Sequence, residues 1–389
     1  MNCRWGWVAA LAVSLTLCSS TLASPLQVVE TDTLPSDLGL DRRLWGDDIR
    51  PGDKYHLLTA IARSLTYLET PEAVEDYAEL SESVSFTRDR VRRSLQRFRE
   101  LVLAANSPQA LDTAVRREFQ FFRAAGTEDS GKVDYTGYYS PTFAASRQRT
   151  SEYQYPLYRR PAELDDWSEP HPTRVELEGK DGLQSDRGPL RGLELVWLRD
   201  RLDAFLVQVQ GSARLQLTNG NTMTVGYAGR TDYEYTSIGK QLVADGKFSR
   251  DELTLGKVRQ YFRDRPDELD NYLPRNLRFV FFEATAGAPP IGSLNVPVTD
   301  GRSVATDKLL MPPGALALIY APLPAGSTVK SDLASAPWES RYVLDQDTGG
   351  AIRGAGRVDL FVGIGPDAER EAGEIDLSGE FYYLLLKES

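Results

Sequence analysis

The sequence predicts a mainly β protein with helices near its N-terminus, and three observations indicate this fold class. Between residues 57 and 122, apolar side chains recur at helical spacing in three stretches. From about residue 134 onward, short apolar runs alternate with turn residues, as is typical of strands. The stretches 286–290 and 321–337 are rich in Pro, Gly, Ala and Ser, so we expect loops or a domain junction there.

The three helical stretches follow a turn-rich segment, residues 24–55, which we expect to be irregular. The first stretch begins at Leu57, and the second, which carries many arginines on its polar face, begins near Val91. The third begins at Ser107-Pro108, an N-cap residue followed by proline at the first helical position. Packing on a sheet is the simplest role for the apolar faces. The third stretch should present Leu111, Val115, Phe119 and Phe122 on one side.

The part after residue 134 is expected to contain short strands, a hairpin and two helical pieces. Asn219-Gly220 predicts the hairpin, because this pair favours the two-residue turn that joins adjacent strands. The helical pieces are expected at Ser237–Ala244 and Leu253–Phe262. The expected strands are 193–198, 205–210, 214–218, 222–227, 277–282, 316–321, 342–345, 357–361 and 382–386.

The composition excludes several classes of protein. With 41% apolar and 26% charged residues, the 389-residue chain is typical of globular proteins rather than disordered ones. Its net charge of −11 argues against a nucleic-acid partner, because nucleic-acid binders normally present a basic face. The chain has two histidines, and its two cysteines are Cys3 and Cys18, which argues against a structural zinc site.

Residues 1–23 are predicted to be a targeting segment. A basic residue precedes an apolar run that ends at Cys18, and small residues follow up to Ala23. The run is shorter than the ~20 residues that span a membrane, so we expect cleavage after Ala23 and export of the remainder. A retained anchor is one alternative. Lipidation of Cys18 is another, although the bulky Leu17 before it is atypical of such signals.

The segment 347–365 combines aspartates with many glycines. It matches neither a Walker-type phosphate loop nor the dinucleotide-binding pattern. Asp347 and Asp359 lie in this segment and Asp307 lies upstream, and each could cap a turn or belong to an acidic site. The chain has no G-x-S-x-G elbow, and its mature part has no cysteine. By elimination, acid–base chemistry falls on carboxylates, as it does in glycoside cleavage.

Tyrosines, amides and glycines gather in a second set of motifs. Tyrosine rings stack on sugar rings, and amide groups form hydrogen bonds with hydroxyl and acetamido groups. The same residue types also fit the core or edge of a β domain, so a sugar-binding and a structural interpretation both stay open. The motifs are Thr136–Pro141, Tyr153–Tyr158, Gln208–Ser212 and Tyr227–Gly229.

Together these segments resemble the lytic murein transglycosylase A family. The matching motifs occur in one colinear order between about residues 134 and 375, and this ordered set is specific although no single tetrapeptide is. They are TGYYSP (136–141), YPLYR (155–159), QGS (210–212), GYAG (226–229), SIGK (237–240), FVFF (279–282), GRSVA (301–305), DTGGAI (347–352), RVDLF (357–361) and GIG (363–365).

The resemblance implies a double-psi β-barrel domain interrupted by an inserted β-rich domain, with a glycan in the groove. One departure concerns Thr231-Asp232-Tyr233, where the family often has Asn-Gly-His, so the role of that loop stays open. The implied divisions are a signal peptide (1–23), the N-terminal helical part of the barrel domain (24–141), the insert (142–283) and the C-terminal three-aspartate part of the barrel (284–389).

The resemblance also implies a reaction and a site. The β-1,4 bond between N-acetylmuramic acid and N-acetylglucosamine is cleaved without water, which leaves a 1,6-anhydro end. Asp359 would be the single general acid and base, Asp347 a supporting carboxylate and Asp307 mainly structural. The implied substrate-binding residues are Tyr138, Tyr139, Gln210, Ser212 and Tyr227.

No cofactor or metal is required by this reaction. The implied partner is the glycan strand of peptidoglycan, bound by a periplasmic or outer-membrane-associated monomer that contacts the membrane only through a lipid anchor. We expect the apolar neighbours Val358, Leu360 and Phe361 to desolvate Asp359 and so favour its protonated form. Two rivals stay open, namely a peptidoglycan hydrolase with two carboxylates and a non-catalytic glycan-binding module.

Overall fold

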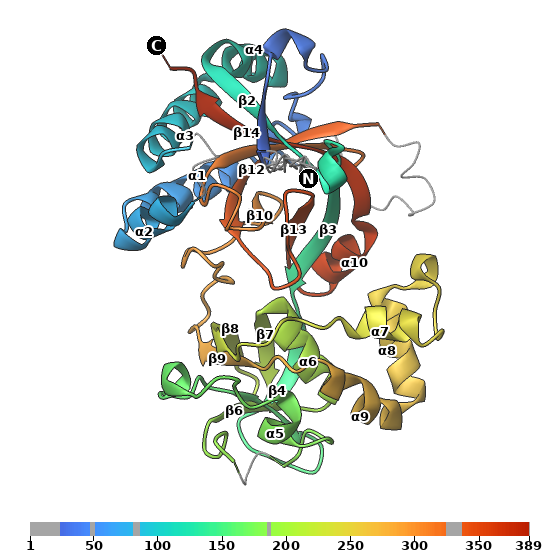
Figure 1. Ribbon diagram of the computed structural model, residues 1–389. Coiled ribbons are helices and arrows are strands. Elements are labelled where there is room, and N and C mark those ends of the chain that lie inside the picture. The colour runs from blue at the N-terminus through green and yellow to red at the C-terminus, as the bar shows by residue number, and fades with distance from the viewer. Residues whose placement is uncertain (1–23, 47–50, 81–85, 185–187, 324–336, 389) are drawn as a thin grey trace, which may run out of the picture.

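The protein has two stacked parts, an eight-stranded sheet with helices around it and a six-stranded sheet below (Figure 1). The computed structural model describes residues 24–46, 51–80, 86–184, 188–323 and 337–388, and the structural statements below concern these ranges. The predicted targeting segment, with Cys3 and Cys18, lies outside the described residues. Within the ranges above, no helix combines the length and the apolar character needed to cross a membrane.

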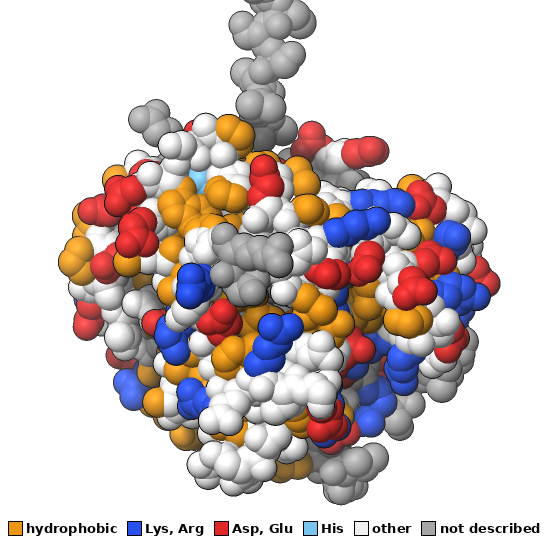
Figure 2. Space-filling view, turned by 90° about the horizontal axis from the view of Figure 1, so that it is seen from below, with side chains coloured by type: hydrophobic (Ala, Val, Ile, Leu, Met, Phe, Trp, Pro, Cys, Tyr) orange, Lys and Arg blue, Asp and Glu red, His pale blue; other side chains and the backbone are white. Residues whose placement is uncertain are grey.

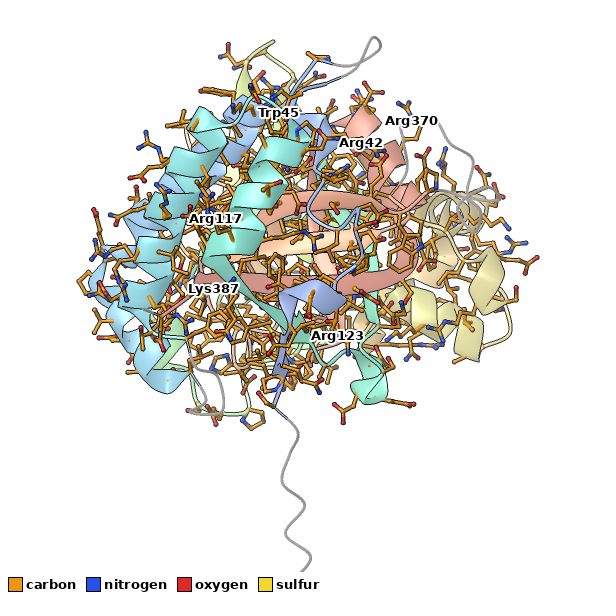
Figure 3. The ribbon with its side chains drawn as sticks, turned by 90° about the horizontal axis from the view of Figure 1, so that it is seen from above. Arg42, Trp45, Arg117, Arg123, Arg370 and Lys387 are labelled. Carbon is orange, nitrogen blue, oxygen red and sulfur yellow. The ribbon has the colours of Figure 1, made fainter. Side chains whose placement is uncertain are left out.

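Four N-terminal helices lie beside the eight-stranded sheet (Figure 1). They are α1 (Lys54–Leu68), α2 (Pro71–Glu79), α3 (Arg88–Ala104) and α4 (Pro108–Glu118). Three of them, α1, α3 and α4, lie against strands of the sheet, and α2 lies against α1 and α3. The predicted N-cap of α4 is confirmed, because Ser107 Oγ accepts the N–H of Ala110 at 3.2 Å. At the other end of α4, Lys387 donates to the carbonyls of Arg116 and Arg117 at 3.0 Å each (Figure 3). A cation thus lies at the negative end of the helix.

Two short strands lie where the sequence predicted other structure. The segment Leu26–Val29, expected to be irregular, forms β1 and pairs antiparallel with β2 (Phe119–Ala124). Because α4 ends at Glu118, Phe119 and Phe122 belong to β2 rather than to a helix face. Phenylalanines are buried on both faces of β2, and such a strand lacks the period of two that distinguishes a strand from a helix.

The other six strands of the larger sheet form a closed ring. They are β3 (Val133–Ser140), β10 (Ser303–Ala305), β11 (Leu316–Ala321), β12 (Glu339–Asp347), β13 (Arg357–Ile364) and β14 (Asp376–Leu386). Their order is β14-β11-β12-β10-β13-β3, and pairing of β3 with β14 closes the ring. β3 runs parallel to β13 and β10 parallel to β12, and the remaining pairs in the ring are antiparallel.

The six-stranded sheet is formed by residues that lie between β3 and β10 in the chain. Its strands are β4 (Thr142–Ser146), β5 (Tyr155–Tyr158), β6 (Glu194–Leu198), β7 (Ser212–Leu217), β8 (Thr222–Arg230) and β9 (Val280–Ala284), in the order β5-β6-β4-β7-β8-β9. The chain enters at β4, one residue after β3, and leaves at β9, three strand spacings or roughly 14 Å away. The hairpin predicted at Asn219-Gly220 is confirmed, since β7 and β8 pair antiparallel across it.

Five helices pack beside this sheet. They are α5 (Arg174–Glu178), α6 (Arg201–Gln210), α7 (Ile238–Ala244), α8 (Leu255–Asp264) and α9 (Leu269–Tyr272). The strand predicted at 205–210 is wrong, because these residues belong to α6. The carboxylate of Asp200 caps α6 by accepting two N–H groups at 2.7 and 3.2 Å. Val207 packs on the sheet and Phe205 packs among the helices, so α6 is apolar on two sides and has no clear polar face.

The helix α10 (Pro366–Glu374) covers β3 and holds the strand that carries the TGYYSP motif (Figure 1). A Cβ on Gly137 would lie 2.6 Å from the Cα of Ala372, so only glycine permits this close packing. The core of the ring and its helices is separate from the cores of the six-stranded part. Seen from below, the molecule presents acidic and basic side chains intermixed with small apolar patches (Figure 2).

Candidate active site

Two of the predicted aspartates lie in register on β12 and β13, the two strands that flank β10 in the ring. Ala305 of β10 is in register with Asp347 of β12 on one side and with Asp359 of β13 on the other. Thr136 of β3 is in turn in register with Asp359. Residues in register on neighbouring strands project from the same face, so both carboxylates project beside the small methyl group of Ala305. Their Cα atoms are two strand spacings, or roughly 10 Å, apart.

Asp359 receives its hydrogen bonds on one carboxylate oxygen. Thr136 Oγ1 donates to Oδ1 at 2.5 Å, and Arg357 Nε donates to the same oxygen at 2.9 Å. Arg357 Nη2 also donates to Thr136 Oγ1 at 2.9 Å, so the three side chains form a closed triangle. The side chain of Asp359 remains 18% exposed, which leaves the carboxylate accessible to a ligand.

The surroundings of Asp359 differ from the sequence-based expectation. Val358 and Leu360 are buried in the core of the eight-stranded part, because successive residues of a strand point to opposite faces. Phe361 returns to the face of Asp359, where its ring centroid lies 5.2 Å from that of Tyr138. The immediate partners of the Asp359 carboxylate are therefore a hydroxyl and a guanidinium rather than apolar groups.

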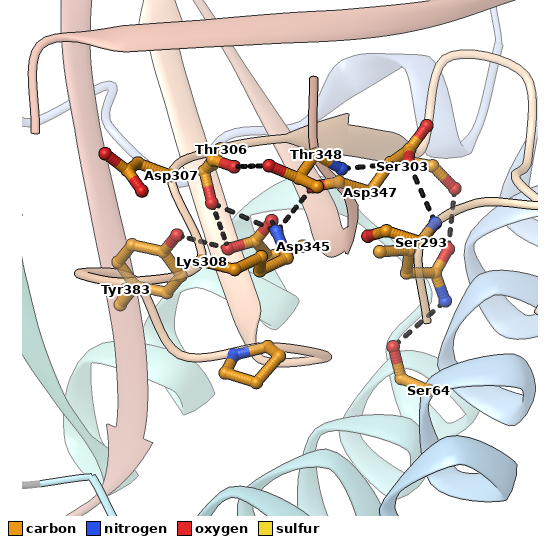
Figure 4. Close-up of polar contacts among 12 residues, drawn as sticks. Ser64, Ser293, Ser303, Thr306, Asp307, Lys308, Asp345, Asp347, Thr348 and Tyr383 are labelled. Carbon is orange, nitrogen blue, oxygen red and sulfur yellow. Dashed lines mark hydrogen bonds and ion pairs between the residues drawn. The ribbon is translucent and has the colours of Figure 1, made fainter. Parts of the chain in front are cut away.

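Asp347 is held at both carboxylate oxygens. The backbone N–H groups of Ser293 and Thr348 donate to Oδ1 at 2.9 and 2.8 Å (Figure 4). The phenol of Tyr138 donates to Oδ2 at 2.8 Å. Although the residue keeps some surface exposure, burial of its carboxyl raises the pKa of Asp347 above the ordinary value. The three hydrogen bonds act in the opposite direction by favouring the charged form.

A further buried carboxylate, which was not among the predicted site residues, lies two residues before Asp347 on β12 (Figure 4). Asp345 forms an ion pair with Lys308 and accepts hydrogen bonds from the hydroxyls of Thr306 and Tyr383 at 2.7 and 2.6 Å. Lys308 also donates to the backbone carbonyl of Asp347. This network joins β12, β14 and the segment after β10 next to the site. The spacing of two residues between Asp345 and Asp347 on one strand was the signal that could have indicated Asp345 from the sequence.

Asp307 makes contacts of a structural kind. It is buried, and its Oδ1 accepts the N–H of Leu309 at 3.2 Å while Oδ2 accepts the N–H of Gly354 at 2.8 Å. Asp307 thus caps its own turn and fastens the loop between β12 and β13. It does not share a hydrogen bond with Asp347 or Asp359 among the described residues.

Three of the predicted binding residues lie where β3 passes into β4. The N–H of Tyr139 donates to Oε1 of Gln210 at 3.4 Å, and the hydroxyl of Ser212 donates to that of Ser140 at 3.1 Å. Tyr139 and Ser212 are buried, and Gln210 is partly exposed at the end of α6. These side chains join the two sheets. Their contact with a substrate stays a prediction.

Tyr227 lies apart from that junction, on β8, and is 49% exposed. It borders an open hollow of about 510 Å³ on the six-stranded part. That volume lies in the range of small-molecule sites. The lining residues are Arg159, Arg160, Leu195, Tyr227, Ala228, Phe282, Glu283 and Ala284.

Arg357 and Thr136 belong to motifs noted in the sequence, but no role was assigned to either. Arg357 precedes Asp359 by two residues, and strand alternation alone places both on one face, so this partner could have been found. Thr136 is 223 residues away from Asp359 in the chain. Its contact depends on the parallel pairing of β3 with β13, which no local signal reveals.

Two protein-family models match the chain, the MltA specific insert domain over residues 134–283 and the 3D domain over residues 302–385. Membrane-bound lytic murein transglycosylase A of Escherichia coli (strain K12) is 31% identical over 277 residues, which cover 70% of this chain and 72% of the relative. The Vibrio cholerae protein of the same name is 30% identical over 328 residues, which cover 82% of this chain and 83% of the relative.

Solved structures with similar folds lead to the same family. A membrane-bound lytic murein transglycosylase from Agrobacterium tumefaciens superposes with a TM-score of 0.71 at 27% identity, covering 93% of this chain and 97% of that chain. E. coli MltA with bound chitohexaose superposes with a TM-score of 0.70 at 25% identity, covering 94% and 95%. The resemblance found in the sequence is thus confirmed, and the chain belongs to the membrane-bound lytic murein transglycosylase A family, with a C-terminal 3D domain.

Proposed function

We propose that this protein is a peptidoglycan lytic transglycosylase that leaves 1,6-anhydromuramic ends. Relatives named lytic murein transglycosylase A align over most of the chain and support the reaction class. The solved E. coli neighbour with bound chitohexaose supports a glycan ligand. The observation that carries the proposal is a difference in hydrogen bonding between the two aspartates beside Ala305. Among the described residues, Asp347 accepts hydrogen bonds at both carboxylate oxygens, whereas Asp359 accepts them only at Oδ1, which leaves its Oδ2 for a proton.

In this proposal Asp359 is the single acid and base. Protonated Asp359 gives its proton to the glycosidic oxygen as the bond from that oxygen to C1 of the muramic acid breaks. The resulting carboxylate is stabilised by Arg357 and Thr136, which already donate to Oδ1. It then takes the proton of the C6 hydroxyl as that oxygen bonds to C1, so the acid is regenerated and no water is consumed.

The attack by the C6 hydroxyl needs no second enzymic nucleophile. The hydroxyl belongs to the same sugar as C1, so the reaction is intramolecular and gains from a high effective molarity. Asp347 then has a positioning role, because it holds Tyr138 and the backbone at Ser293 and Thr348. A base that activates water needs a free lone pair, and three of the roughly four acceptor sites of the Asp347 carboxylate already receive hydrogen bonds. This argues against the two-carboxylate hydrolase.

We also infer that the closed ring is a double-psi β-barrel and that the six-stranded part is a domain inserted into it. The closure through β3 and β14 supports the first inference, and the single residue between β3 and β4 supports the second. The glycan would lie between these parts, with Tyr138 and Tyr227 as stacking residues and Tyr139, Gln210 and Ser212 positioning the junction. The inferred divisions are 24–141, 142–283 and 284–389.

The location of the protein follows from the same proposal. A murein-cleaving enzyme acts in the periplasm, and the relatives named membrane-bound support association with the outer membrane. The inferred route is export directed by residues 1–23, followed either by lipidation of Cys18 or by cleavage after Ala23. We infer a monomer that acts on peptidoglycan strands without a cofactor or metal.

Digestion of murein sacculi by the purified mature protein tests the proposed function. Mass spectrometry of the soluble fragments should detect 1,6-anhydro ends. Reducing ends in their place would show a hydrolase. Retained binding to sacculi without any released fragment would show a non-catalytic binding module. Either of these two outcomes contradicts the proposal.

A further inference from the structure

Three arginines from both parts of the molecule gather near the site, and we call them the arginine cluster. Arg230 ends β8, Arg278 lies two residues before β9, and Arg353 lies in the loop between β12 and β13. They lie close together, because Arg230 and Arg278 both donate to the carbonyl of Tyr233, at 3.3 and 2.7 Å, and Arg278 and Arg353 both lie 3.6 Å from one oxygen of Glu234. The two neighbours add to the effect of burial in lowering the pKa of Arg278. The cluster therefore joins the six-stranded part to the loop that follows Asp347.

The guanidinium of Arg278 is buried but only partly satisfied. Its Nε donates to the carbonyl of Tyr233 at 2.7 Å, whereas Nη2 is buried without a hydrogen-bond partner in the described part of the chain. The side chain is only 8% exposed. A buried donor without an acceptor is costly, so this nitrogen lacks a group that a ligand can supply.

One carboxylate near the cluster, that of Glu234, is shared between two of the arginines. Glu234 Oε2 lies 3.6 Å from Nη2 of Arg278 and 3.6 Å from Nη2 of Arg353, too far for a hydrogen bond to either. Its side chain is 75% exposed and so screened by water. Arg230 donates to the backbone carbonyls of Thr231 and Tyr233 and also forms a hydrogen bond with the neutral phenol of Tyr227, so these contacts bring no negative charge. The cluster thus keeps an excess of positive charge.

The cluster lies between the candidate active site and the hollow beside Tyr227. A Cβ on Gly350 would lie 1.8 Å from Nη1 of Arg278, so the loop three residues after Asp347 rests directly on this guanidinium. On the other side, Arg230, Arg278 and Arg160 all act on the phenol of Tyr227 and oppose the rise in its pKa that burial causes. A glycan that reached from the hollow to the aspartates would therefore pass the cluster.

We propose that the arginine cluster binds a carboxylate of the substrate, an inference that rests on the proposed action on murein. N-acetylglucosamine is neutral, whereas muramic acid carries either a free lactyl carboxylate or a stem peptide with its own carboxylates. Guanidinium groups match the planar, two-oxygen geometry of a carboxylate. The cluster thus distinguishes muramic acid-containing strands from neutral chains of N-acetylglucosamine.

Binding measurements on full-length mature protein carrying Asp359→Asn test this proposal, because that background is designed not to consume the ligand. The variants are Arg353→Gln, at a half-exposed position, and Arg278→Gln, at a buried one, each with circular dichroism as a fold control. Arg92→Gln on the outer face of α3 is the matched control. The ligands are chitohexaose, peptide-free murein strands with free lactyl carboxylates, and peptide-bearing strands, each titrated by calorimetry at two salt concentrations.

Arg353→Gln is expected to weaken binding of at least one carboxylate-bearing ligand about ten-fold or more, which is the usual effect of losing a charge-assisted hydrogen bond. Chitohexaose binding should change less than two-fold, and the salt dependence should fall with the carboxylate ligands. Loss with peptide-free strands assigns the lactyl carboxylate, and loss with peptide-bearing strands assigns the stem peptide. An equal loss with all three ligands, or no loss with any, overturns the proposal.

The readout separates this inference from the proposed function. If wild-type protein releases no anhydro ends while the selective loss of binding is observed, the reaction is wrong and the carboxylate site stands. If wild-type protein releases anhydro ends and the arginine variants bind every ligand like the control, only the carboxylate site is wrong.

Discussion

Replacing Asp359 by asparagine is the strongest test of the mechanism, because one side chain is asked to both donate and accept a proton. The amide cannot donate an acidic proton to the glycosidic oxygen, nor accept one from the C6 hydroxyl. General acid or base catalysis contributes about 10²–10⁴-fold to rate. With both halves lost, we expect Asp359→Asn to release 1,6-anhydromuropeptides at least about 10³-fold more slowly than wild type.

The structure indicates that this change should leave the fold intact. The amide oxygen can replace Oδ1 and still accept from Thr136 and Arg357. What is lost is the charge attraction to Arg357, a partly exposed side chain, and such pairs are worth up to about 1 kcal/mol. Circular dichroism and thermal unfolding should therefore resemble wild type. Asp367→Asn, on the exposed surface of α10, is the matched control and should keep full activity.

A comparison with Asp347→Asn distinguishes the two carboxylates. An amide at 347 can still accept the two backbone N–H groups through its oxygen and can donate to the phenol oxygen of Tyr138. We therefore expect a smaller loss than at Asp359, about 10–100-fold. The reasoning is refuted if folded Asp359→Asn releases anhydro products at a near-normal rate. Asp347, whose pKa is raised by burial, would then be the first candidate for the acid.

Three further predictions concern positioning, pH and packing. In Arg357→Lys the ammonium cannot bridge Asp359 and Thr136 as the guanidinium does, so kcat for anhydromuropeptide release should fall about 10–100-fold while chitohexaose binding stays unchanged. A rate within two-fold of wild type would exclude a positioning role for Arg357. Burial and nearby carboxylates raise the pKa of Asp203 to about 6, so the folded state binds the proton more tightly and stability declines between about pH 4 and pH 6. Asp203→Asn should remove this decline and raise the thermal midpoint at pH 8 by about 1–2 °C, after allowance for solvent screening, with no gain at pH 4. Gly137→Ala should lower the free energy of unfolding in urea by about 1–3 kcal/mol, because its Cβ would clash with α10. Gly373 lies in α10 itself, and a Cβ there would meet nothing within 4 Å, so Gly373→Ala should raise the free energy of unfolding by up to about 1 kcal/mol. Equal effects at both glycines would contradict the packing argument.

The sequence by itself determined the family and many of the local elements. An ordered set of short motifs is much more specific than any one of them, and the comparisons confirm the family that it indicated. The strand Leu316–Ala321 has the predicted bounds, and the hairpin at Asn219-Gly220 is present, because a short apolar run and a two-residue turn are local signals. The errors at 205–210 and at Phe119 have one cause: both segments are buried on two sides, and this removes the periodicity that separates helix from strand.

Which side chains meet was decided only by the tertiary structure. Thr136 reaches Asp359 across 223 residues of chain, because β3 pairs in parallel with β13. The two aspartates face each other across Ala305 because β10 is inserted between their strands. Such contacts depend on the order and the register of the strands, and these are set when the strands close into a ring. Motif spacing contains none of this information, which is why the sequence named both aspartates but could not identify the partners that other strands and loops supply.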